Sequence, residues 1–436
     1  MSYLSFKKDQ LINLEYSLSR EFLGTNRGGG YCSSTLVFCN TRKYHGLLVV
    51  PIEKFRGKNY VMLSSLDETI IQHGRDFNFG VHKYEGTYEP RGHKYIVDIS
   101  YEKAFTVTYQ VGGVLLKKEI LMMHNAPQVL VRYTLLEAHS ATKLRLNPLL
   151  AFRDIHSLSK QNPVASTQPE AADNGIRARL YPEFPYLYMQ FSKKVDFINN
   201  AYWNNNIYYT KEKERGYDYQ EDLLSIGYFE VNLKKGESIV FSASIEEAES
   251  KTLEKNFNKY LKERSERNSA QECLQYSAAQ FLIHKAGETR IKAGYHWFDS
   301  NTRDTFISLP GIALSGNTAK IFDEVLTSAC KYFYEGLFAR DISTHVTNPV
   351  FDADTSLWFF WTLQQYEKES NKTKKQLWKE YGEMLKAILQ TYRSRKHKTM
   401  CMDDNGLIWS DNLSRPLTWF DAEGNYGAIV PRNGYV

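Results

Sequence analysis

The hydrophobic residues between positions 44 and 245 follow a period of two over short runs that end in turn residues. Phe105, Val107 and Tyr109, for example, alternate with polar residues up to Gly112-Gly113, after which a second apolar run follows. Alternation places one face of a strand in a core, and a glycine turn between two such runs is typical of a β-hairpin. The pattern predicts long antiparallel strands packed as two sheets, which form a β-sandwich.

Two other features complete this first region. A second hairpin is predicted where the apolar run 229–233 turns at Lys235-Gly236 into the run 239–245. Residues 157–179 and 199–219 are polar and rich in turn residues, so we predict loops there.

The hydrophobic period changes after residue 268. Residues 246–268 are strongly charged and poor in apolar residues, which favours a helical linker. Beyond them, apolar residues recur at helical spacing within 274–282, 322–333 and 377–389. Helices separated by long aromatic loops are typical of a helical barrel, whose loops at one end can build a site. The predicted domains are a β-sandwich domain (1–245), a charged helical linker (246–268) and a helical domain (269–436).

Composition narrows the class of protein. A chain of 436 residues is too long for one ordinary core. Its 55 basic and 50 acidic residues nearly balance and form no long basic run, which argues against a nucleic-acid partner. The chain has no apolar stretch of about 18 residues and no signal-peptide core, so no membrane partner is expected. Five scattered cysteines without CxxC spacing argue against a disulfide framework and a zinc site, so we predict a cytoplasmic protein.

Residues 294–311 carry the first candidate chemistry, because they combine aromatic residues with an Arg-Asp pair and a Pro-Gly stop. A ring such as Trp297 can cover the apolar face of a pyranose, while Arg303 and Asp304 can hydrogen-bond its hydroxyl groups. The alternative is that Arg303 and Asp304 form a solvated ion pair at the start of a helix, with Asp304 or Thr305 as the cap.

Carboxylates near aromatic residues are the second candidate feature. Hydrolysis of a glycosidic bond needs one carboxyl group as acid and another as base or nucleophile, roughly 5 to 9.5 Å apart, and needs no metal or organic cofactor. Asp304, Asp352, Asp354 and Asp421 each lie close to a Trp or Phe, which can exclude water and raise a carboxyl pKa. For Asp354, which precedes an apolar run, a helix N-cap is the alternative.

The N-terminal region holds two weaker signals. Gly24–Tyr31 is glycine-rich but lacks the Lys-Ser/Thr ending of a phosphate-binding loop. His45 precedes a strand-like run, and a hydrogen-bonded structural histidine is the favoured interpretation over a functional one.

Several motifs in the same order along the chain resemble the glycogen debranching enzyme family of bacteria and archaea, the amylo-α-1,6-glucosidases. They are Glu21–Leu48, Ser64–Glu68 and Pro90–His93 in the N-terminal part, and Ala293–Gly311, Asp354–Trp358 and Leu417–Arg432 in the C-terminal part. The resemblance implies a β-sandwich of the supersandwich kind followed by an (α/α)6 barrel. It also implies hydrolysis of the α-1,6-linked glucose at glycogen branch points, with glycogen or a branched maltooligosaccharide as partner.

The resemblance assigns roles to individual residues. Asp421 resembles the general acid of an inverting reaction. Arg303 and Asp304 resemble the pair that binds the terminal glucose. The remaining residues implied for the cleft are the aromatic residues Trp297, Trp358 and Trp419, together with Asp354 and Arg432.

The chain departs from the family pattern at three places. Asn301-Thr302 stands where the family has Trp-Gly, Ala339-Arg340 where it has Pro-Asn, and the usual Tyr-Asn before Asp354 is missing. The family also continues beyond the motif at 431–434. We therefore expect a C-terminally truncated member with an incomplete barrel, a catalytic base in the absent part, and little or no glucosidase activity.

Two other functions stay open at this point. One is a catalytically silent fragment that binds glycogen or maltooligosaccharides, which cosedimentation with glycogen would reveal. The other is a relative of glucoamylase or of the glycoside phosphorylases, and phosphate-dependent formation of a sugar phosphate would identify a phosphorylase. The sequence makes no prediction of oligomeric state.

Overall fold

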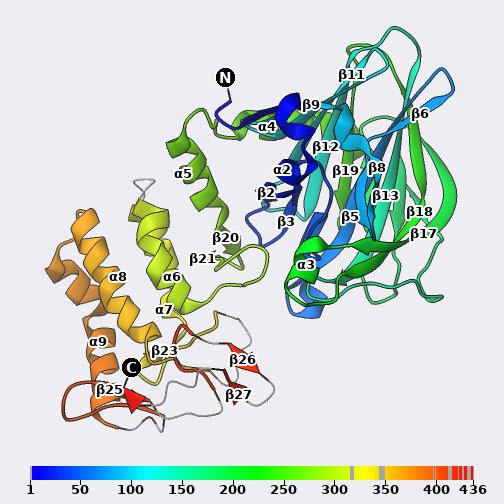
Figure 1. The fold of residues 1–436 in the computed structure, drawn as a ribbon. Coiled ribbons are helices and arrows are strands. Elements are labelled where there is room, and N and C mark those ends of the chain that lie inside the picture. The colour runs from blue at the N-terminus through cyan, green and yellow to red at the C-terminus, as the bar shows by residue number, and fades with distance from the viewer. Residues whose placement is uncertain are drawn as a thin grey trace. The chain divides into compact units, whose positions relative to one another are not determined.

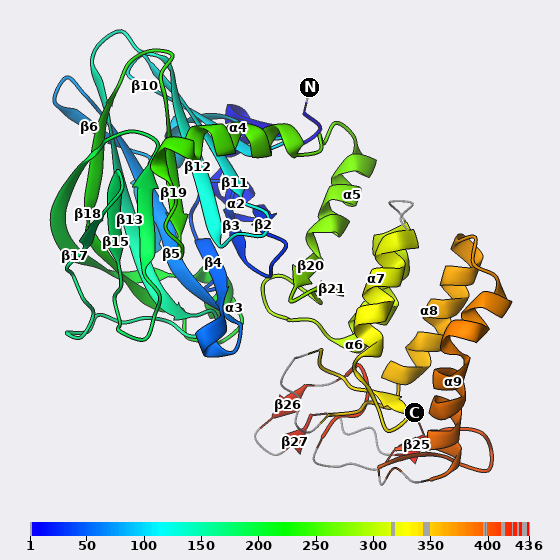
Figure 2. The same cartoon turned by 180° about the vertical axis from the view of Figure 1, so that it is seen from behind.

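The computed structural model divides into two compact units, Met1–Tyr276 and Ser277–Val436. Figure 1 and Figure 2 show the fold from opposite sides. Within the described part of the chain, no helix is long and apolar enough to cross a membrane. The structure describes residues 2–314, 319–342, 349–395, 397, 399–410, 415–420, 422–424, 427–429 and 434–435.

The first unit is built on two large antiparallel sheets that share one apolar core. Apolar residues of both sheets, such as Val131 and Leu144, are fully buried in it, as the alternating pattern predicts. The nine-stranded sheet has the order β1 (Ser5–Lys7), β9 (Ile96–Tyr101), β10 (Phe105–Val111), β11 (Val114–Met122), β12 (Gln128–Glu137), β19 (Ser238–Ser244), β16 (Leu187–Phe191), β15 (Gly175–Ala178), β14 (Glu170–Ala172).

The second sheet of this unit has eight strands, and a separate small hairpin accompanies it. The order of the sheet is β17 (Asp196–Tyr208), β18 (Gln220–Leu233), β13 (Thr142–Asp154), β5 (Lys58–Gln72), β4 (Gly46–Ile52), β3 (Tyr31–Thr35), β2 (Glu21–Thr25), with β6 (Arg75–Asn78) paired to β5. The hairpin consists of β7 (Val81–Tyr84) and β8 (Thr87–Arg91).

The two predicted hairpins fare differently. The first is confirmed: β10 and β11 pair from Phe105 opposite Ile120 to Val111 opposite Val114. Its turn residues Gly112 and Gly113 have φ values of 55° and 79°, which favour glycine. The second is wrong, because β18 and β19 belong to different sheets and β19 pairs with β12 and β16. Alternation shows which face of a strand is buried but does not identify its neighbour.

The loop predicted for residues 199–219 is also wrong. Its first half belongs to β17, which forms an edge of its sheet and pairs with β18 alone. Strand pairing uses the backbone, so asparagine-rich residues on an exposed edge can join a sheet despite their low β-propensity. Its second half contains the short helix α3 (Thr210–Glu214).

Short helices complete the first unit. Helix α4 (Leu253–Glu263) packs Leu253 and Phe257 against Leu130 and Val240 of the nine-stranded sheet. Leu274, predicted to lie on a buried stripe, is exposed. The other helices are α1 (Lys8–Leu11), α2 (Leu14–Leu18), α5 (Ala270–Gln280), which runs into the second unit, and the 3-10 turns Glu53–Phe55, Gly92–Tyr95 and Ser250–Thr252.

The second unit is helical in its main part. Phe306, Phe338 and Phe359 are fully buried and meet at centroid distances of 4.8 to 5.2 Å. Phe322 and Tyr366 stack 3.9 Å apart. The helices are α6 (Thr302–Leu309), a short π-helix (Pro310–Leu314), α7 (Ala319–Cys330), α8 (Thr355–Glu369) and α9 (Lys374–Arg393). The strands are β20 (Leu282–Lys285), β21 (Glu288–Ile291), β22 (Phe333–Tyr334), β23 (Leu337–Phe338), β24 (Met400–Met402), β25 (Ile408–Ser410), β26 (Glu423–Gly424), β27 (Gly427–Ala428) and β28 (Gly434–Tyr435).

Candidate active site

Helix α6 begins with a cap that orients Asp304. The side-chain oxygen of Asn301 accepts from the backbone N–H of Asp304 at 2.7 Å, and its amide group donates to Oδ2 of Asp304 at 2.7 Å. Asn301 is therefore the cap, and the prediction of Asp304 or Thr305 in that role is wrong. The side chain of Asp304 remains 42% exposed.

Arg303 lies among three carboxylates. Its side chain is only 5% exposed, and Nη1 lies 3.0 Å from Asp352 and 3.6 Å from Asp354. Its Nε lies 3.9 Å from Asp304. The alternative of a solvated Arg303–Asp304 ion pair is therefore wrong, because the guanidinium is buried and, among the described residues, lies closer to Asp352 than to Asp304.

Asp352 is fully buried and acts as a structural anion. The Nε of Arg340 lies 2.8 and 2.9 Å from its two oxygens, and Nη2 of Arg340 also donates to it. Oδ2 additionally accepts from Arg303. Since both oxygens are engaged by guanidinium groups, Asp352 is not an open cleft carboxylate of the kind considered from the sequence.

Asp354 has a different environment from its neighbour Asp352. It occupies the N-cap position of α8 but makes no side-chain capping bond. Burial raises the pKa of Asp354, the charge of Arg303 lowers it, and the charge of Asp352 raises it, so that the net shift is upward. Its side chain is 17% exposed, so this carboxyl group lies at the edge of the cluster.

The segment 415–420 is attached next to these carboxylates. The backbone N–H of Ala353 donates to the carbonyl of Leu417 at 2.7 Å, and Arg340 donates to the carbonyl of Pro416 at 2.8 Å. Trp419 follows with 59% exposure and lies edge-on to Phe420. The structure thus brings the Arg303 cluster and the Trp419 segment together.

The other predicted site residues are distributed as follows. Trp297 is half-buried in the loop before α6, edge-on to His296. Trp358 is half-buried on α8, and its backbone N–H donates to the carbonyl of Asp354. Asp421 and Arg432 lie outside the described residues.

Two sequence profiles match the chain over nearly its whole length. The profile described as glycogen debranching enzyme N terminal matches residues 20–240, and the amylo-alpha-1,6-glucosidase profile matches residues 276–436. The chain belongs to the glycogen debranching enzyme family. This debranching-family chain is accordingly a member of a glycoside hydrolase family, and the candidate cluster lies in its amylo-alpha-1,6-glucosidase region.

Comparison of the debranching-family chain with curated protein sequences finds no match. Among solved structures, a bacterial glucoamylase complexed with acarbose is 11% identical with a TM-score of 0.47, covering 90% of this chain and 59% of its own. A family GH92 α-mannosidase from Bacteroides thetaiotaomicron is 10% identical with a TM-score of 0.31, covering 94% of this chain and 67% of its own. A putative aldose 1-epimerase from Escherichia coli K12 is 8% identical with a TM-score of 0.27, covering 51% of this chain and 98% of its own.

Arg340 is the residue of the site that sequence reasoning missed. It was visible only as a departure from the family pattern, without an assigned role. Its partner Asp352 lies 12 positions later in the chain, and no periodicity connects the two. The only sequence signal for Arg340 is weak: Asp352 precedes a predicted helix in this debranching-family chain, and a carboxylate that becomes buried needs a cationic partner.

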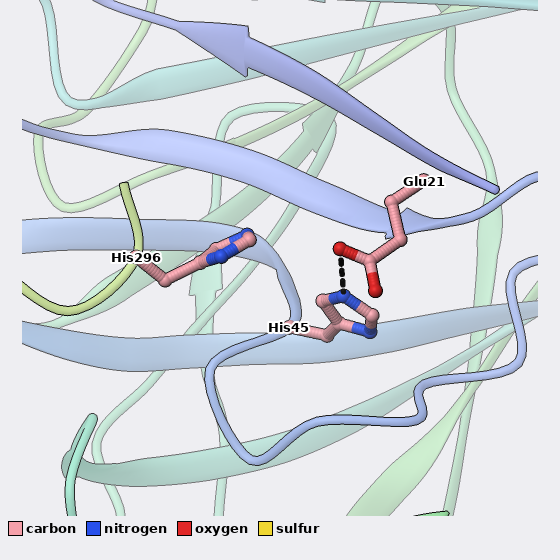
Figure 3. Close-up of side chains that lie close together, drawn as sticks. All are labelled: Glu21, His45 and His296. Carbon is pink, nitrogen blue, oxygen red and sulfur yellow. Dashed lines mark ion pairs between the residues drawn. The ribbon is translucent and has the colours of Figure 1, made fainter. Parts of the chain in front are cut away.

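The N-terminal motifs of the debranching-family chain form structural contacts. His45 is fully buried, its Nδ1 accepts from the backbone N–H of Thr41 at 3.2 Å, and its Nε2 lies 3.5 Å from Glu21 (Figure 3). Burial lowers the pKa of His45. Burial raises the pKa of Glu21, but hydrogen bonds and charge from His45 and Arg42 outweigh this and lower it to about 2. These contacts agree with the structural interpretation of His45.

The glycine-rich turn is closed by its own asparagine. The side-chain oxygen of Asn26 accepts from the backbone N–H groups of Gly28 and Gly30, each at 2.8 Å. Two amides that a phosphate cradle would present are therefore already bound within the turn.

Proposed function

We propose that the protein is an amylo-α-1,6-glucosidase that hydrolyses the α-1,6-linked glucose at glycogen branch points. The observation that carries the proposal is the group of three aspartates around Arg303, inside the region that matches the amylo-alpha-1,6-glucosidase profile. Two of the three, Asp304 and Asp354, keep exposed surface that a sugar hydroxyl can reach.

The proposed architecture follows from the same family. We propose a supersandwich in residues 1–245, a linker in 246–268 and the N-terminal part of an (α/α)6 barrel in 269–436. The five cysteines are free thiols, which supports a cytoplasmic location because disulfides are rare there. The proposed partner is glycogen or a branched maltooligosaccharide.

The proposed reaction is inverting. Asp421 is the proposed general acid that protonates the leaving oxygen, while a second carboxylate activates water on the opposite face of the sugar. Asp304 and Arg303 bind the hydroxyl groups of the terminal glucose. The other proposed contacts are Trp297, Trp358 and Trp419, which cover apolar sugar faces, and Asp354 and Arg432, which line the cleft.

The raised pKa of Asp354 supports this arrangement. Burial favours the protonated form of this carboxyl group, and the protonated form can donate a hydrogen bond to a sugar oxygen. Trp419 supports it too, because a 59% exposed tryptophan beside a carboxylate cluster offers a stacking surface for a pyranose ring.

Glucose release from a glycogen limit dextrin tests the proposal. We expect Asp421→Asn, made in a full-length context, to abolish release and to leave dextrin binding unchanged, since the amide keeps the shape of the acid but cannot donate its proton. Asp404→Asn is a suitable control, because Asp404 is fully exposed and its partner is the surface residue Arg395. Unchanged turnover by Asp421→Asn would refute the assignment, and binding of glycogen without any glucose release would favour the silent binding fragment.

A further inference from the structure

Three segments of the second unit meet around the buried ion pair of Asp352 and Arg340. The start of α6 contributes Thr302, whose N–H donates to the carbonyl of Arg340 at 2.8 Å and whose hydroxyl group donates to the carbonyl of Ala339 at 2.6 Å. The backbone of Arg340 donates in turn to the carbonyl of Val350, two residues before Asp352. Each segment is therefore fixed to the next by backbone bonds as well as by side chains.

The same ion pair reaches the segment that carries Trp419. Arg340 uses one guanidinium for two purposes, because Nη2 donates both to Asp352 and to the carbonyl of Pro416. Asp352 likewise has two cationic partners, Arg340 and Arg303. The two side chains thus form a continuous chain of charged hydrogen bonds from Arg303 to residue 416.

We propose that Asp352 and Arg340 are positioning residues of the active site. Asp352 holds Arg303 through their ion pair, and Arg340 holds segment 415–420, which carries Trp419, next to Asp354 through its hydrogen bond to Pro416. This inference rests on the proposed function for its catalytic consequence, whereas the positioning itself is a property of the fold. Neither residue is proposed to touch substrate, because the side chain of Asp352 is fully buried and the guanidinium of Arg340 donates to Asp352 and to the carbonyl of Pro416.

The test uses the full chain labelled with 5-fluorotryptophan, in which the fluorine resonances of Trp419 and Trp203 are assigned by Trp→Phe variants. Trp203 lies in the first unit and reports whether that unit is intact. We expect Asp352→Asn and Arg340→Gln to shift or broaden the Trp419 resonance and to leave the Trp203 resonance in place. Arg340→Lys, which keeps the charge but loses the bidentate geometry, should give a smaller change of the same kind.

Asp323→Asn is the matched control. Asp323 accepts from Tyr366 and Lys372 near the other end of α8, so its loss removes a carboxylate of the same unit without touching the positioning pair. The Trp419 resonance should stay in place in this variant. A Trp419 resonance that is unmoved in Asp352→Asn and Arg340→Lys would overturn the proposal.

Glucose release from a limit dextrin gives the catalytic readout on the same proteins. We expect kcat/KM to fall about 100-fold in Asp352→Asn, as misplacement of a site by about 1 Å can cause, and to be unchanged in Asp323→Asn. If the parent chain releases no glucose, as its departures from the family pattern lead us to expect, the Trp419 resonance alone decides the positioning role.

Discussion

The stability of the second unit should depend more on Asp352 than on either of its arginine partners. Asp352→Asn leaves two guanidinium groups, with side-chain exposures of 5% and 13%, facing a neutral amide. Removing one partner of a buried ion pair typically costs about 3–5 kcal/mol. Arg340→Gln is milder, since Asp352 keeps Arg303 at 3.0 Å, and the lost charged hydrogen bonds cost about 1.5–3 kcal/mol.

Hydrogen exchange of the α8 backbone amides measures these costs within the second unit. Helix α8 begins three residues after Asp352, and its opening exposes the cluster. We expect exchange to accelerate more than about 100-fold in Asp352→Asn and clearly less in Arg340→Gln, at about 1.4 kcal/mol per factor of ten. The control Asp323→Asn should change it by about 1 kcal/mol or less, because Asp323 is 43% exposed. An equal or larger effect of Arg340→Gln would refute the reasoning.

Three further predictions concern pH and packing. Because the pKa of Asp354 is raised in the folded state, ionisation of Asp354 destabilises that state. Asp354→Asn should therefore raise the melting temperature at pH 7. This increase in melting temperature should vanish as the pH falls towards 3.8. Burial lowers the pKa of His82, but the charge and hydrogen bond of Asp67 outweigh burial and raise it. The stabilisation that this pair gives to the fold should therefore be complete below pH 6.5 and decline above it. His82→Gln should remove this pH dependence of the unfolding free energy, as measured by urea titrations at a series of pH values. Phe306→Ala should destabilise the second unit by about 3–5 kcal/mol in the same exchange assay, because the ring is fully buried against two phenylalanines.

The alternating pattern was sufficient to predict the sheet-rich first unit and the hairpin at Gly112-Gly113. It failed for β18 and β19, because burial of one face is compatible with many partners and the connection passes from one sheet to the other. It also failed for β17, where backbone pairing at a sheet edge overrides the composition of the side chains.

The candidate site also contains some features that the sequence could predict and others that it could not. Residue chemistry and the family motifs pointed to Arg303, Asp304 and Asp354, and the structure places both carboxylates within ion-pair distance of Arg303. The Arg340–Asp352 contact could not be predicted, because it depends on how two loops fold back on each other. Asn301 as cap was missed for a simpler reason: asparagine is as good a cap as aspartate, and the sequence allowed both.

Binding of a branched sugar tests the central claim most directly. Calorimetric titration of the full chain would compare a maltooligosaccharide carrying one α-1,6-linked glucose with a linear maltooligosaccharide of the same number of glucose units. We predict preferential binding of the branched sugar and at least a tenfold loss of affinity in Asp304→Asn, about 1.4 kcal/mol for a lost charged hydrogen bond. Equal binding of the two sugars, or undiminished binding by Asp304→Asn, would contradict a glucose site at Arg303 and Asp304.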